Sequence, residues 1–281
     1  QSPVPSPQSP VPSPQSPVPK NLDNFTNQAI LRLEQVNLST RLKTQAQNNL
    51  PGYPILQDIS FEVFPGDRII IVGLAGAGKT SLLRLINRLT EPTSGKIYLG
   101  NQEYHQISII QLRQEVTFVQ QESKLLGMTV REALAYPLVL RGWSKHKIQE
   151  RVSYWQEQLQ IPEQWLGRTE VQLSAGQRQL VAIARTLVIQ PKILLLDEPT
   201  FALDPGKASR LIIILKELTQ IHKTTILMVN HQLDLAQQFC NRLLHLQKGQ
   251  ILANQHSSEI NWEDLKTTLI QAEYQAPEEW I

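Results

Sequence analysis

The chain has 281 residues, of which 27 are basic and 25 are acidic, so its formal net charge is only +2. This near-neutral balance gives no indication of a nucleic-acid groove, and no apolar run approaches the length of a membrane span. A single cysteine, Cys240, excludes an intramolecular disulfide and suits a reducing compartment.

The N-terminal segment is repetitive. Residues 1–19 repeat the unit QSPVPSP with a period of seven residues. Such a Pro/Ser-rich segment lacks the apolar side chains that a core needs, so residues 1–22 are predicted to be a disordered tail rich in polyproline II. A spacer is the favoured role, and a PxxP ligand is the alternative. The remaining length fits one large α/β domain with a smaller helical lobe.

The first predicted strand covers residues 31–39. Leu31 and Leu33, and then Val36 and Leu38, alternate with polar residues, which is typical of a half-buried strand. We expect an antiparallel piece over residues 30–65, which leads into the next apolar run.

Residues 73–80 read GLAGAGKT and satisfy the pattern GxxxxGK followed by Ser or Thr. The apolar run 69–72 precedes the motif, and leucines at helical spacing follow it, so the loop joins a buried strand to a helix. Backbone N–H groups and the positive end of the helix bind phosphate in this context. Lys79 can reach the β- and γ-phosphates, and the Thr80 hydroxyl can bind Mg²⁺. The predicted nucleotide-binding residues are Gly73, Leu74, Ala75, Gly76, Ala77, Gly78, Lys79, Thr80 and Ser81.

Two carboxylates follow a second buried strand. The apolar run 193–196 ends in Asp197 and Glu198. An Asp at the tip of a parallel strand lies beside the phosphate loop, where it can hold Mg²⁺ through water. Because side chains alternate along a strand, Glu198 is expected to point to the other side. It can act there as general base for a water that attacks the γ-phosphate.

Residues 173–179 read LSAGQRQ and precede a helix with one apolar face. Ser174 offers a hydroxyl, Gly176 offers an unobstructed backbone N–H, and the helix N-terminus is a second anion site. A Ser followed by Gln three residues later is also a helix N-cap pattern. Both interpretations can hold, because an N-cap is also a phosphate site.

With this motif the chain resembles the ATP-binding-cassette (ABC) ATPases, whose signature is LSGGQ; Ala175 replaces the first Gly. The resemblance covers about residues 30–255 and implies an α/β P-loop NTPase fold. This fold has a mostly parallel core sheet, an N-terminal antiparallel β subdomain and a helical signature lobe at about 122–172. It also implies that one signature motif caps ATP bound to the opposite subunit, through Leu173, Ser174, Ala175, Gly176 and Gln177.

Other family positions follow in order. Gln121 resembles the Q-loop glutamine that contacts Mg²⁺ and the attacking water, with the adjacent Gln120 as the alternative. His231 resembles the H-loop histidine that touches the γ-phosphate. Asp204 resembles the D-loop aspartate, which crosses the dimer interface, although Phe201 stands where the family usually has Ser. The implied catalytic residues are Glu198, His231 and Gln121, and the implied Mg²⁺ ligands are Thr80, Gln121 and Asp197.

The adenine-stacking residue departs from the family pattern. The family places an aromatic residue near the end of the first strand, and that position falls here near Thr40 or Arg41. The guanidinium plane of Arg41 can stack on the base. Tyr53 is the alternative, although its place between two prolines favours a turn.

The C-terminal extension covers residues 256–281, after a hairpin at Lys248 and Gly249. Trp262, Leu265 and Leu269 recur at helical spacing and predict a short surface helix. In the family the helical lobe also receives a helix from the membrane subunit. The candidates for that apolar contact are Leu125, Leu126 and Met128, with local packing within the lobe as the alternative.

The resemblance implies a subunit that binds and hydrolyses ATP with Mg²⁺ and powers transport by a separate integral-membrane permease. It implies a second ATP-binding subunit as partner, with a homodimer favoured, and a peripheral position on the cytoplasmic face of the membrane. No nucleic-acid partner is expected. A soluble ABC ATPase of the DNA-repair or translation type is the alternative, which the single cassette disfavours. Cargo is selected by the membrane partner.

Overall fold

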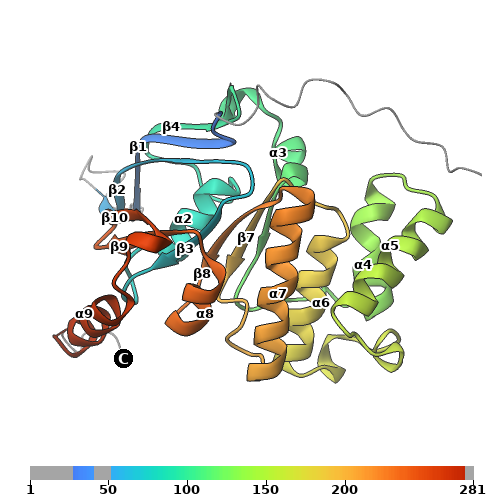
Figure 1. Cartoon of the computed structure of the whole chain (residues 1–281). Helices are drawn as coiled ribbons and strands as arrows, with labels where there is room; N and C mark the ends of the chain where they lie inside the picture. The colour runs from blue at the N-terminus through green and yellow to red at the C-terminus, as the bar shows by residue number, and fades with distance from the viewer. Residues whose placement is uncertain (1–27, 41–51, 276–281) are drawn as a thin grey trace, which may run out of the picture.

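The computed structural model describes residues 28–40 and 52–275. These residues fold into two β-sheets with helices packed around them (Figure 1). The expected α/β class, with a mostly parallel core sheet and an antiparallel sheet at the N-terminal end, is confirmed. The repeat segment 1–22 and Arg41 lie outside the described residues.

The core sheet has the strand order β10-β9-β3-β8-β7-β6. Neighbours from β9 to β6 pair in parallel, and β10 pairs antiparallel with β9. The central strands are short and apolar because both of their faces are covered. The strands are β3 (Arg68–Val72), β6 (Val116–Val119), β7 (Ile193–Asp197), β8 (Thr225–Val229), β9 (Arg242–Gln247) and β10 (Gln250–His256).

Side-chain alternation divides each central strand between two hydrophobic cores. In β3, Ile70 and Val72 belong to the core that the large helices cover. Ile69 and Ile71 belong to the second core, which lies under the antiparallel sheet. Both cores are therefore fixed to the same strands, and the loops at the ends of these strands have a rigid base.

The antiparallel sheet has the order β2-β1-β4-β5. The strand expected at 31–39 is confirmed as β1, but the turn favoured for Tyr53 is wrong. Tyr53 begins β2, pairs with Thr40 and is 64% exposed. Pro54 is tolerated there because β2 is an edge strand. The strands are β1 (Leu31–Thr40), β2 (Tyr53–Val63), β4 (Ser94–Leu99) and β5 (Gln102–Glu103).

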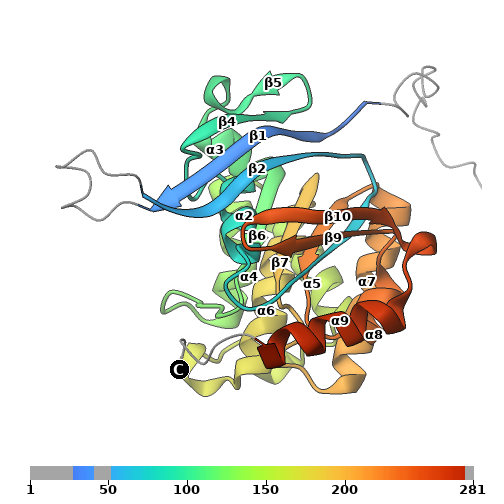
Figure 2. The ribbon, with the colours of Figure 1, turned by 90° about the vertical axis from the view of Figure 1, so that its left-hand side faces the viewer.

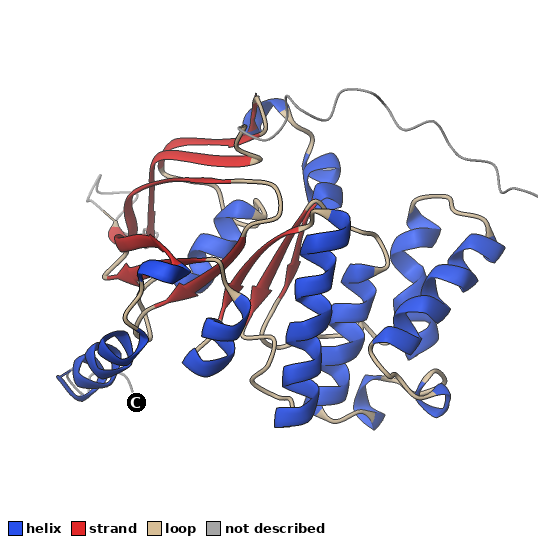
Figure 3. Ribbon diagram, in the orientation of Figure 1, coloured by secondary structure: helices blue, strands red, loops and turns tan. Residues whose placement is uncertain are grey.

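The helices cover the sheets unevenly. α6 and α7 stand against the core sheet, with α4 and α5 farther out (Figures 1 and 3). Among the described residues, no helix is long and apolar enough to cross a membrane. The α-helices are α2 (Lys79–Ile86), α3 (Ile109–Glu115), α4 (Val130–Leu140), α5 (Lys145–Gln158), α6 (Ala175–Leu187), α7 (Pro205–His222), α8 (Leu233–Phe239) and α9 (Trp262–Gln275). Short 3₁₀ turns are η1 (Tyr104–Gln106), η2 (Glu163–Trp165), η3 (Glu170–Gln172) and η4 (Ser257–Glu259).

Between β6 and α6 the chain is helical. α4 begins with a capping box, in which the Thr129 side chain and the Glu132 side chain satisfy each other's backbone N–H groups. On α5, Val152 and Trp155 are buried together with Leu159 at the helix end, so one face of this helix packs into the core. These contacts fix the helical lobe to α6, the helix that follows the LSAGQ segment.

The C-terminal hairpin is confirmed. Lys248 and Gly249 join β9 to β10 with positive φ angles of 46° and 78°. The helix expected from Trp262, Leu265 and Leu269 is α9, and these three side chains pack against the core. α9 lies beside α8 (Figure 2), so the extension closes one side of the domain.

Candidate nucleotide-binding and hydrolysis site

The GLAGAGKT segment forms the loop between β3 and α2, and a side chain at either of two of its glycines would force neighbouring atoms to move. A Cβ atom at Gly73 would lie 2.1 Å from the Leu246 carbonyl oxygen, and one at Gly78 would lie 2.7 Å from a methyl carbon of Leu56. Gly78 is the N-cap of α2 and provides no side-chain cap. The first N–H groups of α2 are therefore available to an anion, as phosphate binding requires.

Lys79 closes the loop on itself. Its Nζ atom donates hydrogen bonds to the carbonyl oxygens of Gly73 (2.7 Å) and Leu74 (2.8 Å). Burial lowers the pKa of Lys79, while the nearby Glu198 and Asp197 carboxylates act in the opposite direction. The ammonium is thus held inside the loop, at the position where phosphate oxygens would replace the two carbonyl partners.

Asp197 ends β7 and is 3% exposed. Burial raises the pKa of this carboxyl, and a hydrogen bond with the Thr80 side chain opposes that shift. Its Oδ1 atom is buried without a partner among the described residues. An unpaired carboxylate oxygen beside a hydroxyl is the oxygen-rich environment that Mg²⁺ prefers, so Asp197 and Thr80 fit the ion.

Glu198 lies one residue beyond β7, so the alternation of a strand does not set its direction as expected. Its φ angle is 49°, in the left-handed region. The Glu198 N–H donates to the Val229 carbonyl oxygen at the end of β8 (3.0 Å), which holds this conformation. The side chain is turned by the backbone after the strand ends, rather than by the pleat.

The Glu198 carboxylate lies between two of the other predicted residues. Oε1 is 2.9 Å from Nε2 of His231, and Oε2 accepts a hydrogen bond of 3.1 Å from Nε2 of Gln121. The alternative, Gln120, instead lines a separate hollow between the end of β6 and α6. The structure thus brings Gln121, Glu198 and His231 together at the carboxyl ends of neighbouring parallel strands.

Three polar residues that no sequence motif selects, Thr200, Asn230 and Gln232, support this arrangement. Thr200 is 1% exposed, and its Oγ1 atom accepts a hydrogen bond of 3.2 Å from Asn230. The same Oγ1 atom lies 3.2 Å from Oε1 of Gln232, to which the hydroxyl donates. These bonds fix the segment around His231 to the segment after Glu198. The sequence marks them only by position, because Thr200 lies two residues after Glu198 and the other two flank His231.

The signature segment is confirmed as a capped helix start. The Ser174 hydroxyl accepts from the Gln177 N–H (3.2 Å), and the Gln177 side chain accepts from the Ser174 N–H (2.9 Å). Ser174 and Ala175 are exposed. A Cβ atom at Gly176 would lie 2.4 Å from the Ala202 carbonyl oxygen, so the signature segment touches the D-loop of its own chain.

Asp204 caps α7 and accepts from the Lys207 N–H (3.0 Å) and the Lys207 ammonium (2.6 Å). These hydrogen bonds from Lys207 hold the pKa of Asp204 below its usual range. The predicted D-loop aspartate therefore has a local structural role in one copy of the chain.

The three side chains expected to contact a membrane subunit differ in exposure. Leu125 is fully buried, so that expectation is wrong, whereas Met128 is partly buried against the core and its contact stays a prediction. Leu125 and Leu126 are adjacent and point in different directions, and the backbone at Leu126 has a positive φ angle of 56°. Leu126 is 73% exposed and lines the hollow that also contains Gln120 and Arg185.

A phosphate loop, a buried carboxylate beside it and a second carboxylate held by Gln and His define a P-loop nucleotide hydrolase. A family model described as "ABC transporter" matches residues 56–201, just over half of the chain. The chain therefore belongs to the ABC transporter family, as an ATP-binding subunit that hydrolyses ATP.

Similar curated proteins are methionine import ATP-binding proteins. MetN of Mannheimia succiniciproducens is 36% identical over 236 residues, which cover 80% of this chain and 68% of that protein. MetN 1 of Staphylococcus aureus is 34% identical over 220 residues, which cover 77% of this chain and 64% of that protein. The chain thus spans about two thirds of the length of these relatives. They give no support to the non-transport alternative.

Solved structures show the same fold. A dimeric post-hydrolysis state of the ATP-binding cassette MJ0796 with ADP and Pi has a TM-score of 0.74 and 26% identity, and covers 81% of this chain and 98% of its own. The cbiO1 protein of Clostridium perfringens, part of the ABC transporter complex cbiONQ, has a TM-score of 0.72 and 26% identity, with coverages of 89% and 97%.

Proposed function

We propose that two copies of this chain bind Mg-ATP between them and hydrolyse it, and that their closing and opening powers a separate integral-membrane permease. The observation that carries the proposal is the Glu198 carboxylate, which Gln121 and His231 hold at the end of β7. Glu198 lies next to Asp197 and near Lys79. The proposed base, ion site and phosphate site therefore lie together at one edge of the core sheet.

ATP binding uses the free N–H groups at the start of α2 and the Lys79 ammonium. The γ-phosphate oxygens replace the carbonyls of Gly73 and Leu74 as partners of Nζ. Thr80, Asp197 and Gln121 would hold the magnesium ion. When bound, Mg²⁺ neutralises negative charge on the phosphate oxygens.

For hydrolysis, Glu198 takes a proton from the attacking water as general base. Gln121 and His231 contact its two oxygens, which fixes the position of the carboxylate after the end of β7. His231 reaches the γ-phosphate from the end of β8, and its side chain is 53% exposed on the open side of the site. A fixed base of this kind contributes typically about 10²- to 10⁴-fold to the rate.

A second copy completes the site. The exposed Ser174 and the N-terminus of α6 cap ATP bound at the phosphate loop of the other copy. ATP favours the closed dimer because only that state supplies both halves. Loss of the γ-phosphate removes the bridge and reopens the dimer. A similar solved cassette is dimeric, which supports this arrangement.

The permease docks at the hollow of about 410 Å³ beside the Q-loop, between the end of β6 and α6, where the helical lobe begins. Leu126 offers an exposed apolar side chain there, and Arg185 donates a hydrogen bond of 3.1 Å to the Lys124 carbonyl oxygen. Gln120 and Ser123 also line the hollow, directly beside Gln121. A helix docked in the hollow would therefore shift the backbone next to Gln121, and with it the position of the Gln121 side chain. Because the similar proteins are named for methionine import, amino acids are the first class of cargo to test.

The test is Glu198→Gln, which keeps the shape of the side chain but removes the base. We expect unchanged ATP affinity, hydrolysis slower by roughly 10²-fold or more, and an ATP-dependent dimer on gel filtration. Glu217→Gln, an exposed change on α7, is the matched control. Hydrolysis by Glu198→Gln within a factor of about two of the parent would contradict the assignment of the base.

A further inference from the structure

The D-loop presents an exposed aromatic side chain on a rigid support. Phe201 is 73% exposed and stands where the family usually has Ser. Its N–H donates to the Glu198 carbonyl oxygen (3.2 Å), and the Leu203 N–H donates to the Thr200 carbonyl oxygen (3.1 Å). The backbone on both sides of Phe201 is thus closed into tight turns.

Both ends of this loop are anchored. On one side, the buried Thr200 is hydrogen-bonded to Asn230 and Gln232. On the other side, the Ala202 carbonyl oxygen lies against Gly176 of the signature segment. An aromatic side chain on such a preorganised loop loses little conformational entropy on binding, which is typical of an interface anchor.

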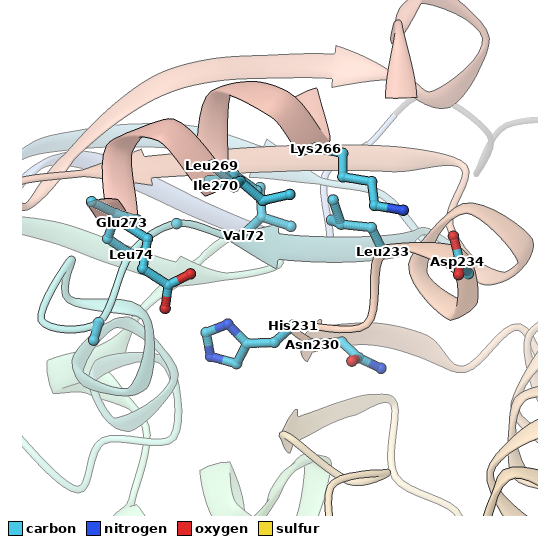
Figure 4. Close-up of a pocket in the computed structure, with 12 residues that line it drawn as sticks. Val72, Leu74, Asn230, His231, Leu233, Asp234, Lys266, Leu269, Ile270 and Glu273 are labelled. Carbon is cyan, nitrogen blue, oxygen red and sulfur yellow. The ribbon is translucent and has the colours of Figure 1, made fainter. Parts of the chain in front are cut away.

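A pocket that can receive an aromatic side chain borders the phosphate loop. It has a volume of about 430 Å³ and lies between the phosphate loop, the segment around His231, and α9 (Figure 4). Figure 4 shows α9 side chains across the cavity from His231 and Asn230. The apolar side chains of the lining are Val72, Leu74, Ala75, Leu233, Leu269 and Ile270, and polar or charged side chains complete it.

The wall formed by α9 lies outside the segment that the family model matches, which ends at residue 201. Leu269 packs against the core, whereas Ile270 remains 44% exposed at the cavity. The phosphate-loop wall consists of residues 73–75. The pocket therefore borders the edge of the ATP site that a second copy must cover.

The contact between Gly176 and Ala202 decides which part of a second copy meets this pocket. In the closed dimer the signature segment of one copy lies over the phosphate loop of the other. Since the signature segment and the D-loop touch, Phe201 is brought to the same phosphate loop. We propose that Phe201 of each copy inserts into the pocket between the phosphate loop, His231 and α9 of the other copy.

This inference rests on the proposed function, because it requires the ATP-closed dimer. It adds that α9 is part of the dimer interface. It also links the two sites: Phe201 is three residues from Glu198 in its own chain and would contact the His231 segment of the other. Closure would then desolvate an apolar side chain at each site, which favours the dimer.

Cross-linking in the Glu198→Gln background tests the contact. Phe201→Cys and Ile270→Cys are combined in one chain, and a short bismaleimide, which tolerates a wider spacing than a disulfide, is added with Mg-ATP. The natural Cys240 can stay, because burial raises the pKa of its thiol to about 11 and keeps it protonated. We expect a covalent dimer on denaturing gels and a peptide that joins positions 201 and 270.

The matched control combines Phe201→Cys with Ile221→Cys, since Ile221 is 72% exposed on α7. No peptide joining positions 201 and 221 is expected from it. If gel filtration shows the ATP-dependent dimer but positions 201 and 270 never join, the inference is overturned while the proposed function stands. If Mg-ATP produces no dimer in the Glu198→Gln background, both are overturned.

Discussion

The buried carboxyl of Asp197 lowers the stability of the nucleotide-free fold when it is ionised. Its Oδ1 atom has no partner among the described residues, and burial raises its pKa. A group whose folded-state pKa is raised contributes stability below its unfolded pKa and loses that contribution as pH rises through the folded value. At neutral pH, ionised Asp197 therefore destabilises the nucleotide-free fold.

Asp197→Asn should accordingly raise the melting temperature of the nucleotide-free protein at neutral pH. We expect a rise of about 2–4 °C, the shift that about 1 kcal/mol produces in a domain of this size. The difference from the parent should shrink as pH falls toward the raised pKa. The same variant should lose the extra stabilisation that Mg²⁺ adds to ATP. Thermal melts at several pH values measure both effects.

Asp204→Asn is the control for that experiment, because the pKa of Asp204 is lowered whereas the pKa of Asp197 is raised. Hydrogen bonds from Lys207 depress the pKa of Asp204, so the ionised form favours the fold above the unfolded pKa and the benefit is lost as pH falls. Asp204→Asn should give no gain at neutral pH. A melting temperature of Asp197→Asn equal to or below the parent would contradict the argument.

Single residues of the site differ in how far the sequence predicted them. Lys79 and Thr80 follow from a local motif whose spacing fixes their geometry. The direction of Glu198 does not, because its positive φ depends on a hydrogen bond to the end of β8, a strand distant in sequence. Thr200 and Asn230 were missed for the same reason: isolated polar residues carry no periodic signal, and their partners are set by the fold.

At the scale of elements, the close contact between the start of α6 and the D-loop links two parts of the site. Gly176→Ala would place a Cβ atom 2.4 Å from the Ala202 carbonyl oxygen, so the loop would have to move. We expect normal ATP affinity in one copy but hydrolysis reduced by about tenfold or more, the scale on which misplaced site geometry acts. Calorimetry and a phosphate-release assay separate the two quantities.

Gly167→Ala is the matched control, because a Cβ atom there meets nothing within 4 Å. It should leave both ATP affinity and hydrolysis unchanged. Equal hydrolysis by Gly176→Ala and the parent would show that the D-loop adjusts freely, and the rigid link would be wrong.

Elements with a clear period were predictable, and those set by pairing were not. The alternation in 31–39 and the apolar run before the phosphate loop correspond to β1 and β3. Tyr53 was expected in a turn because prolines flank it, yet its pairing with Thr40 extends the edge strand. Tertiary pairing overrides the local preference there. Adenine stacking by Tyr53 or Arg41 stays a prediction.

For the whole molecule, two cores share the strands of one sheet, and this sets where the site can lie. The carboxyl ends of the neighbouring parallel strands β3, β8 and β7 lie at one edge of the sheet. Gly73, Asn230 and Asp197, which stand at the ends of these strands, therefore lie close together. The class of fold was predictable from motif order alone. The cavity beside α9 was not, because it needs the position of a C-terminal helix that no motif specifies.

The two ends of the chain should contribute differently to the folded unit. Deletion of residues 1–19 should leave melting temperature and ATPase rate unchanged, because this Pro/Ser repeat lacks the apolar content of a core. Deletion of residues 261–281 removes Trp262, Leu265 and Leu269 from the core they pack against. These three side chains are partly buried, so each contributes less than the about 1.5–3 kcal/mol of a fully buried one, and we expect the melting temperature to fall by at least about 2 °C. Scanning calorimetry on both truncations compares them directly, and a drop for the first, or none for the second, would reverse the assignment of the two ends.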